Sequence, residues 1–346
     1  MIINVNGVAC STIDEVRNNS SKDFADFLEE YLNDSCHVKA HTSGSTGTPK
    51  EILLQKSDMR MSARLTNEFF GIGEGSVLYL PLSPSYIAGK MMIVRALDAG
   101  AAIYEEKPSN EPLANYGGPF IDLIAVVPSQ LNFMINMPGL LDKVGAMIIG
   151  GGQLSEKMER WLADKGVNAY KTYGMTETCS HVALSKVSST ADDPYEAIGN
   201  IAFECDERGC LVVKTPHLSA GRYVTNDVVQ LIDDKHFVWL GRIDNVINTG
   251  GIKVFPEEIE PKLAKLIPHS RFYVASRSSD KWGEELVLVV EYASLPENTV
   301  KTGEIKPAFI EEMKKVLPNH SVPRYYVAVG KFEETASGKV IRKNYN

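Results

Sequence analysis

Short apolar runs bounded by glycine or proline most constrain the fold of the first two-thirds of this chain. Residues 76–82, 121–128 and 144–152 each have the length and composition of a buried strand. Residues 155–166 follow with the apolar spacing of a helix, and residues 167–174 resume as a strand. Strand, helix and strand in succession are typical of a mostly parallel sheet covered by helices. We therefore expect an α/β fold in this part.

The pattern changes near residue 205. The segments after it read as antiparallel ribbons, and a polar stretch with two glycines then leads from Gly241 into a helix that Pro256 opens. The elements expected beyond it are a helix over 256–267, strands near 272–276 and 285–292, a helix over 304–317 and a strand over 324–332. We expect two domains, a large α/β domain over 1–241 with mixed sheets and helices and a small α+β domain over 242–346.

Composition excludes several functional classes. The 346 residues are 44% hydrophobic and carry a formal net charge of −8, which argues against a non-specific nucleic-acid binder. No apolar run approaches the roughly 20 residues of a membrane span, and the N-terminus lacks a signal-peptide pattern. The five cysteines form no CxxC pair, which favours reduced thiols over disulfides or a zinc site. We expect a cytoplasmic protein that binds neither nucleic acid nor membrane.

The stretch TSGSTGTPK at 42–50 combines glycines with small hydroxyl residues. Successive backbone N–H groups in such a loop converge on one point, which suits phosphate, and Lys50 adds a positive charge. Pro49 stands where the P-loop motif needs its second glycine, so the stretch is not that motif, nor is it a dinucleotide GxGxxG. Taken alone, such a stretch is more often a plain surface loop.

Four further stretches follow this loop. They are YGMTET at 173–178, YVTNDVV at 223–229, GRIDNVINTGGIKVFPEEIE at 241–260 and TASGKVIRK at 335–343. Each alone has a structural explanation, such as a core tyrosine, a capping aspartate or a surface charge. Together with the loop at 42–50, they resemble the motifs of the adenylate-forming superfamily, which includes acyl- and aryl-CoA synthetases, peptide-synthetase adenylation domains and luciferases.

This resemblance implies a reaction and its cofactors. Members join a carboxylate to AMP with release of pyrophosphate, and they usually then pass the acyl group to a thiol. A small carboxylic acid, ATP, Mg²⁺ and CoA would be the partners of this chain. Because two anions must meet, positioning and preorganised positive groups should dominate catalysis.

The resemblance also assigns residues that would bind the phosphates and the base of ATP. The loop would cradle the β- and γ-phosphates through Thr42, Ser43, Gly44, Ser45, Thr46, Gly47 and Lys50. Three glycines, Gly150, Gly151 and Gly152, would let the backbone approach the base, on which Tyr173 would stack. Thr176 would touch the α-phosphate, and Glu177 would hold Mg²⁺.

The ribose and the C-terminal residues follow in the same way. Asp227 would bind the ribose hydroxyls, although its motif reads T-N-D where the superfamily usually has T-G-D. Arg242 would help to position the ribose and phosphate, and Lys339 would bridge the acid and the α-phosphate during adenylation. Asp244 would be the hinge about which a mobile C-terminal domain rotates between two poses. In the second pose, Gly250 and Gly251 would leave room for a pantetheine arm.

The acyl pocket is expected to include Tyr86, Ser129, Gln130 and His181. Tyr86 occupies the gate position, where the superfamily often has histidine, and a core tyrosine is an open alternative. The other three would accept a polar group or a second carboxylate. Alternatively, Ser129 and Gln130 only cap a helix after Pro128.

The phosphate loop begins early in the chain, so we expect the N-terminal subdomain of typical members to be largely missing. This trimmed layout resembles the short o-succinylbenzoate–CoA ligases of bacterial menaquinone biosynthesis. The substrate implied is 2-succinylbenzoate, activated on its succinyl carboxylate. A shortened flank would also expose a surface that a homodimer could cover.

Three other functions stay open. The chain could be a different acyl- or aryl-CoA ligase, which only a panel of acids would distinguish. A peptide-synthetase-like adenylation domain would need an acidic residue for an amino group, and none stands at the expected place before Pro84. A nucleotide-binding protein without catalysis is disfavoured by the presence of Lys50, Glu177, Asp227, Arg242 and Lys339.

Overall fold

The computed structural model describes residues 3–41, 50–137, 139–188, 193–296, 299–334 and 340–345. Its helices are α1 (Ile13–Asn19), α2 (Lys22–Leu32), α3 (Lys56–Phe70), α4 (Ile87–Ala99), α5 (Pro128–Met134), α6 (Glu156–Asp164), α7 (Pro256–Ala264) and α8 (Pro307–Met313). Short 3-10 helices lie at Leu141–Lys143, Thr176–Thr178, Ile243–Asn245 and Asn319–Ser321.

The strands divide into an earlier and a later set. The earlier strands are β1 (Ile3–Val5), β2 (Val8–Cys10), β3 (His37–His41), β4 (Glu51–Gln55), β5 (Val77–Leu80), β6 (Ala102–Glu105), β7 (Ile121–Val126), β8 (Val144–Ile149), β9 (Ala169–Gly174), β10 (His181–Lys186), β11 (Tyr195–Ala197), β12 (Ala202–Cys205), β13 (Cys210–Thr215), β14 (Gly221–Leu231) and β15 (His236–Arg242). The later strands are β16 (Ile247–Thr249), β17 (Ile252–Val254), β18 (Phe272–Ser279), β19 (Gly283–Glu291), β20 (Val300–Glu304) and β21 (Tyr325–Val329).

Within the described residues, one sheet of thirteen strands organises the N-terminal part, in the order β12-β13-β14-β15-β11-β10-β9-β8-β7-β5-β6-β1-β2. The run from β1 to β9 through β6, β5, β7 and β8 is parallel, and the strands from β9 to β12 pair antiparallel. A separate hairpin of β3 and β4 places His41 opposite Glu51.

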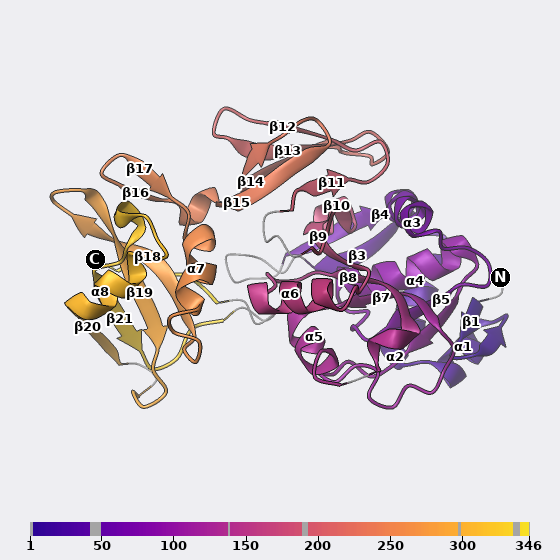
Figure 1. The fold of residues 1–346 in the computed structure, drawn as a ribbon. Coiled ribbons are helices and arrows are strands. Elements are labelled where there is room, and N and C mark those ends of the chain that lie inside the picture. The colour runs from indigo at the N-terminus through magenta and orange to yellow at the C-terminus, as the bar shows by residue number, and fades with distance from the viewer. Residues whose placement is uncertain are drawn as a thin grey trace.

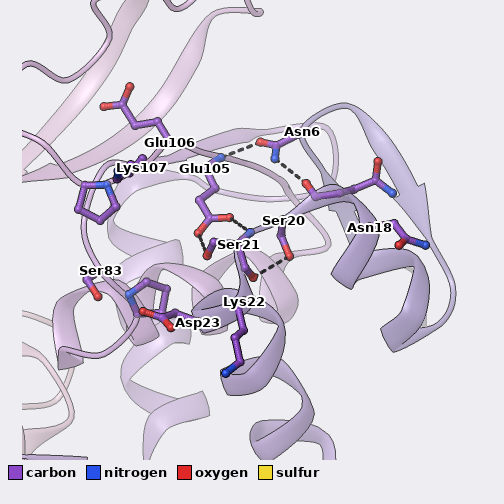
Figure 2. Close-up of a pocket in the computed structure, with 13 residues that line it drawn as sticks. Asn6, Asn18, Ser20, Ser21, Lys22, Asp23, Ser83, Glu105, Glu106 and Lys107 are labelled. Carbon is purple, nitrogen blue, oxygen red and sulfur yellow. Dashed lines mark hydrogen bonds between the residues drawn. The ribbon is translucent and has the colours of Figure 1, made fainter.

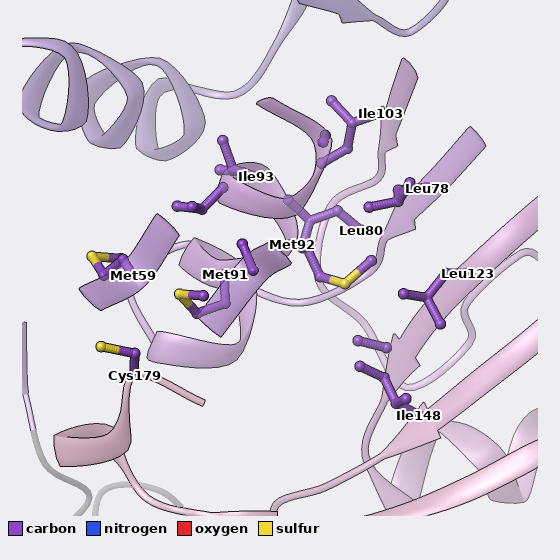
Figure 3. Close-up of a cluster of buried hydrophobic side chains, with 14 of the residues drawn as sticks. Met59, Leu78, Leu80, Met91, Met92, Ile93, Ile103, Leu123, Ile148 and Cys179 are labelled. Atoms are coloured by element: carbon purple, nitrogen blue, oxygen red, sulfur yellow. The ribbon is translucent and has the colours of Figure 1, made fainter. Parts of the chain in front are cut away.

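The main hydrophobic core lies between the parallel strands and the helices α3 and α4. Figure 3 shows Met59 of α3 and Met91, Met92 and Ile93 of α4 gathered beside strand residues such as Leu78. Helix α4 is almost wholly buried, because its apolar residues recur on every side. It ends at Gly100, whose φ of +65° is a left-handed conformation that suits glycine.

The C-terminal part builds its own six-stranded sheet, in the order β17-β16-β19-β21-β20 with β18 paired to β19. Two hydrophobic clusters, centred on residues such as Leu263, Met313 and Val289, pack against this sheet. Figure 1 shows it with α7 and α8 at the left, apart from the parallel strands at the right. The strand β15 and the 3-10 helix at Ile243–Asn245 connect the two parts.

The α/β fold class predicted from the sequence is confirmed. The runs at 121–128 and 144–152 form β7 and β8, and the segments 155–166 and 167–174 form α6 and β9. The division into domains at residues 241 and 242 stays a prediction. No helix within the described residues is long and apolar enough to cross a membrane.

The helix predicted over 304–317 is wrong in its extent. Helix α8 covers only Pro307–Met313, and Glu304 belongs to strand β20, which the sequence pattern did not reveal. Pro307 opens the helix and disfavours helical backbone at the residue before it, so the helix cannot begin earlier.

Candidate active site

Tyr173, Asp227 and Arg242 come together at one point of the large sheet. Tyr173 stands near the end of β9, and Asp227 of β14 pairs directly with Arg242 of β15. The Tyr173 hydroxyl donates to Asp227 Oδ2 at 2.7 Å, and Arg242 Nη1 lies 3.7 Å from Asp227 Oδ1. The residues predicted for adenine, ribose and phosphate therefore share one site, although they are far apart in the sequence.

Trp239 is a member of this site that the sequence motifs did not indicate. Its indole Nε1 donates to Asp227 Oδ1 at 3.2 Å, so each oxygen of this carboxylate has a donor. Burial, followed by the charge of Asp227, raises the pKa of Tyr173 well above its ordinary value and keeps its hydroxyl a donor. The available signal was a tryptophan on the strand that ends at Arg242.

The glycines Gly150, Gly151 and Gly152 follow β8 in a crowded place. A Cβ on Gly150 would lie 2.7 Å from Thr172 Oγ1, and one on Gly151 would lie 3.2 Å from Val127 Cγ1. Gly151 also has a φ of +80°. A side chain is thus disfavoured at Gly150 and Gly151, whereas a Cβ on Gly152 would meet only Pro128 Cγ at 3.6 Å.

The YGMTET motif forms a tight turn that presents Thr176 and Glu177. The Thr178 hydroxyl accepts from the Met175 N–H at 3.1 Å and donates to the Ser180 carbonyl at 2.8 Å. Thr176 is buried within the turn, whereas the Glu177 side chain is exposed. The turn therefore offers a free-standing carboxylate beside a fixed hydroxyl residue.

Gly174 is essential to this turn, and Gly174→Ala is expected to destabilise the protein. Its new Cβ would lie 2.2 Å from the Ser180 carbonyl oxygen, which is backbone and cannot move aside. Overpacking of this kind costs about 1–3 kcal/mol, so the melting temperature should fall by several degrees. Gly73→Ala is the matched control, because nothing lies within 4 Å of its Cβ position. Equal melting temperatures for the two variants would contradict this reading of the turn.

The predicted hinge residue Asp244 lies in the 3-10 helix between β15 and β16. Arg242 Nη2 donates to Asp244 Oδ2 at 2.6 Å, and Asn226 Nδ2 lies 3.4 Å from both of its carboxylate oxygens. Farther along, the Gly250 N–H donates to the Trp282 carbonyl at 2.8 Å, and a Cβ on Gly250 would lie 2.9 Å from the Trp282 ring. Gly250 and Gly251 both have positive φ, so this turn requires glycine.

The four residues predicted for the acyl pocket lie in different surroundings. Tyr86 precedes α4 and its side chain is 53% exposed, which excludes the alternative of a core tyrosine. Ser129 is exposed in the first turn of α5. The Gln130 side chain accepts from the Val127 N–H and donates to the carbonyls of Pro81 and Ser109, so it caps the start of α5 and ties two loops together.

His181 begins β10 and is buried. Its Nε2 lies 3.1 Å from Thr66 Oγ1, and its Nδ1 lies 3.3 Å from Ser180 Oγ. Burial, followed by the charge of Arg95, lowers the pKa of His181 well below its ordinary value. The imidazole is therefore neutral at neutral pH and cannot supply a positive charge to a substrate.

Arg95 of α4 supplies the positive charge at this place, and it escaped the sequence analysis. Its side chain is 1% exposed. Nη2 donates to Ser180 Oγ at 2.6 Å and Nη1 lies 3.4 Å from Met92 Sδ, while Nε has no hydrogen-bond partner. Among the described residues, no carboxylate forms an ion pair with it. The sequence feature that could have indicated Arg95 is a single charged residue within the apolar segment 91–96.

Several predicted residues lie outside the described part of the chain. They are Thr42, Ser43, Gly44, Ser45, Thr46 and Gly47 of the phosphate loop and Lys339 near the C-terminus. Lys50 is described and exposed, immediately before β4. Their roles stay predictions.

A polar cavity of about 610 Å³ lies elsewhere, between α1, α2 and the end of β6. Figure 2 shows Glu105 accepting from both the backbone and the hydroxyl of Ser21 at its centre. None of the predicted site residues lines this cavity. The residues predicted to bind the nucleotide therefore lie apart from this cavity.

Comparisons with known proteins find similarity over most of the chain. The family described as AMP-binding enzyme matches residues 9–222. A 2-succinylbenzoate–CoA ligase from Enterococcus faecalis is 24% identical over 338 residues, which cover 88% of this chain and 68% of that protein. A protein of the same name from Listeria monocytogenes is 24% identical over 330 residues and covers 87% of this chain.

Solved structures show the same fold. An acyl-CoA synthetase (AMP-forming)/AMP-acid ligase II-like protein from Dyadobacter fermentans is 29% identical, with a TM-score of 0.61 over 92% of this chain and 91% of that one. An o-succinylbenzoate CoA synthetase from Bacillus subtilis, bound to its acyl-adenylate intermediate, has a TM-score of 0.72 at 20% identity. This likeness covers 88% of this chain and 67% of that one.

Proposed function

The chain belongs to the family of AMP-binding enzymes and is an AMP-forming acid–thiol ligase; from this premise we propose that its acid is 2-succinylbenzoate and its thiol is CoA. In the first step the succinyl carboxylate attacks the α-phosphorus of ATP, a new O–P bond forms and pyrophosphate leaves. In the second step the CoA thiol displaces AMP and a thioester forms. The product would serve menaquinone biosynthesis, the pathway of the ligases that this sequence resembles.

The observation that carries the choice of acid is the unpaired Arg95. The side chain is buried, and its Nε has no partner among the described residues. Burial lowers the pKa of Arg95 to about 9, so the guanidinium is still protonated at neutral pH. A buried charge without an opposite charge is costly, and an anionic ligand would offset that cost.

A dicarboxylic acid supplies such an anion without using its reacting group. In 2-succinylbenzoate one carboxylate is activated, and the ring carboxylate stays free to bind the guanidinium. The fork of N–H donors on arginine matches the two oxygens of a carboxylate. Ser180 and His181 border the same place, so they would complete the surroundings of the second carboxylate.

The nucleotide half of the site supports ATP as the other substrate. The Asp227 carboxylate, which already accepts from Tyr173 and Trp239, would also accept from the ribose hydroxyls. The described residues hold no group of three or more metal ligands. A single exposed carboxylate, Glu177, nevertheless fits Mg²⁺, because Mg²⁺ bound to substrate phosphates uses only one or two protein carboxylates. When bound, Mg²⁺ neutralises phosphate charge during the transfer.

The remaining positive groups and the thiol step rest on the resemblance. Lys50 and the loop before it would bind the β- and γ-phosphates, and Lys339 would bring the acid to the α-phosphate. The C-terminal part would act as a lid that rotates at Asp244. The turn at Gly250 and Gly251 would then face the thiol.

A competition between acids tests this proposal. The protein is incubated with ATP, Mg²⁺, CoA and equal concentrations of 2-succinylbenzoate, benzoate and a medium-chain fatty acid, and the thioesters are identified by mass spectrometry. We expect only 2-succinylbenzoyl-CoA. A thioester of another acid would keep the ligase chemistry and overturn the choice of substrate. Absence of every thioester would favour nucleotide binding without catalysis.

A further inference from the structure

We propose that Asn226 is a positioning residue that holds the hinge carboxylate of Asp244 against the large sheet. This proposal rests on the proposed function, because the rotation at Asp244 belongs to it. Asn226 is the residue at which the motif departs from the usual T-G-D. A glycine at this position would have no side chain to reach Asp244. The contact with the hinge therefore depends on the asparagine that this chain has there.

The side-chain amide of Asn226 lies between a hydrogen-bond acceptor, the Asp244 carboxylate, and a hydrogen-bond donor, the Arg208 guanidinium. Its Nδ2 lies 3.4 Å from both carboxylate oxygens of Asp244, and its Oδ1 accepts from Arg208 Nη1 at 3.1 Å. A carboxylate only accepts hydrogen bonds and a guanidinium only donates them. The two neighbours therefore fix the orientation of the amide, with its donor end toward the hinge.

Arg208 is itself held in place, so the amide has a rigid support. Its Nε donates to Asp206 Oδ2 at 2.9 Å and its Nη2 donates to the Thr225 carbonyl at 3.0 Å. Arg208 and Asp206 lie in the turn between β12 and β13, and Thr225 lies in β14 beside Asn226. These groups belong to the large sheet or to the turn between two of its strands.

Asp244 is thus held by two side chains of the large sheet. Arg242 ends β15, where it pairs with Asp227, and Asn226 lies in β14. Rotation at Asp244 would have to move its carboxylate away from both side chains. The contact therefore favours the pose seen here over any pose in which Asp244 leaves β14.

The same contacts connect the hinge with the nucleotide site. Asn226 is the neighbour of Asp227, and Arg242 faces both Asp227 and Asp244, at 3.7 Å and 2.6 Å. Without the Asn226 contact, the relative strengths of the ion pairs that Arg242 forms with Asp227 and with Asp244 would change. We therefore expect the hinge and the nucleotide to influence each other.

Two substitutions of Asn226 test the proposal in the full chain without any ligand. Asn226→Asp is nearly isosteric and places a carboxylate against Asp244, and Asn226→Leu removes both hydrogen bonds. The measurement is native-state hydrogen exchange of the backbone amides over 242–255. Because the contact of Asn226 with Asp244 is long, at 3.4 Å, its net strength is modest, and exchange there should be about three- to tenfold faster in both variants.

The control variant is Glu204→Gln in β12, which lies in the same sheet and pairs with Lys214 and Arg222 rather than with the hinge. It should leave the exchange of 242–255 unchanged, and the amides of β7 should be unchanged in every variant. Unchanged exchange over 242–255 in both Asn226 variants would overturn the proposal. This result does not depend on activity, so it is distinguishable from a wrong assignment of the acid.

A second readout separates positioning from a merely structural role. Pyrophosphate release and thioester formation from preformed acyl adenylate are measured for each Asn226 variant. A shift in the hinge equilibrium changes the ratio of the two rates, and we expect a change of about threefold or more. Equal losses in both steps, with a lowered melting temperature, would show that Asn226 serves only the fold.

Discussion

Arg95→Met is expected to lower kcat/KM for 2-succinylbenzoate by about thirtyfold to several thousandfold, because removal of one partner of a buried charge pair costs about 2–5 kcal/mol. The variant should also melt at a higher temperature than the ligand-free wild type. Arg95 is buried without an acidic partner, and its replacement by an apolar side chain removes the cost of burying that charge. Steady-state kinetics and thermal unfolding measure the two effects.

The opposite signs of these effects distinguish a substrate-binding arginine from a structural one. A structural arginine would lower stability and activity together when removed. A matched substrate adds a second control, namely 4-oxo-4-phenylbutanoate, which keeps the succinyl chain and lacks the ring carboxylate. We expect this acid to be poor for the wild type and little affected by Arg95→Met. Equal losses on both acids would contradict the assignment of Arg95 to the ring carboxylate.

Lys339→Ala is expected to lower adenylation by about a hundredfold to a thousandfold, the usual cost of losing one preorganised group that stabilises developing charge. Formation of the thioester from preformed acyl adenylate should change by much less, since Lys339 would serve only the pose for adenylation. The two steps are measured separately, by exchange of pyrophosphate into ATP and by release of AMP in the presence of CoA.

Lys343→Ala is the matched control for this lysine. It removes a nearby lysine of the same C-terminal segment that pairs with Glu333 on the surface. Exposed ion pairs contribute little, so both steps should stay close to wild type. A Lys339 variant that loses both steps equally would count against a lid with two poses.

Much of the large sheet was predictable because its strands are continuous apolar runs. The strands β7 and β8 are mostly buried in the parallel run of the sheet, and such strands need no alternation of polar residues. Helix α4 was missed for the same reason, because a helix buried on all sides has no amphipathic period to detect. The short strand β20 at the edge of the C-terminal sheet was missed because its residues are mostly exposed and polar.

The sequence predicted the site residues that stand in local motifs, and it missed the residues whose roles depend on packing in three dimensions. Tyr173, Asp227 and Arg242 stand in motifs, and the register of β14 with β15 brings the last two together. The role of Arg95 depends on the burial of α4 beside Ser180 and His181, and Ser180 lies 85 residues farther along the chain. The role of Asn226 likewise depends on where Arg208 and Asp244 lie in space.

Release of pyrophosphate tests the central claim most directly. The purified protein is given ATP, Mg²⁺ and CoA with 2-succinylbenzoate, with benzoate, with a medium-chain fatty acid or with no acid. We predict release with 2-succinylbenzoate alone, together with one CoA thioester for each pyrophosphate. Release with another acid and not with 2-succinylbenzoate would contradict the assigned substrate, and no release with any acid would contradict the assignment of this chain as a working ligase.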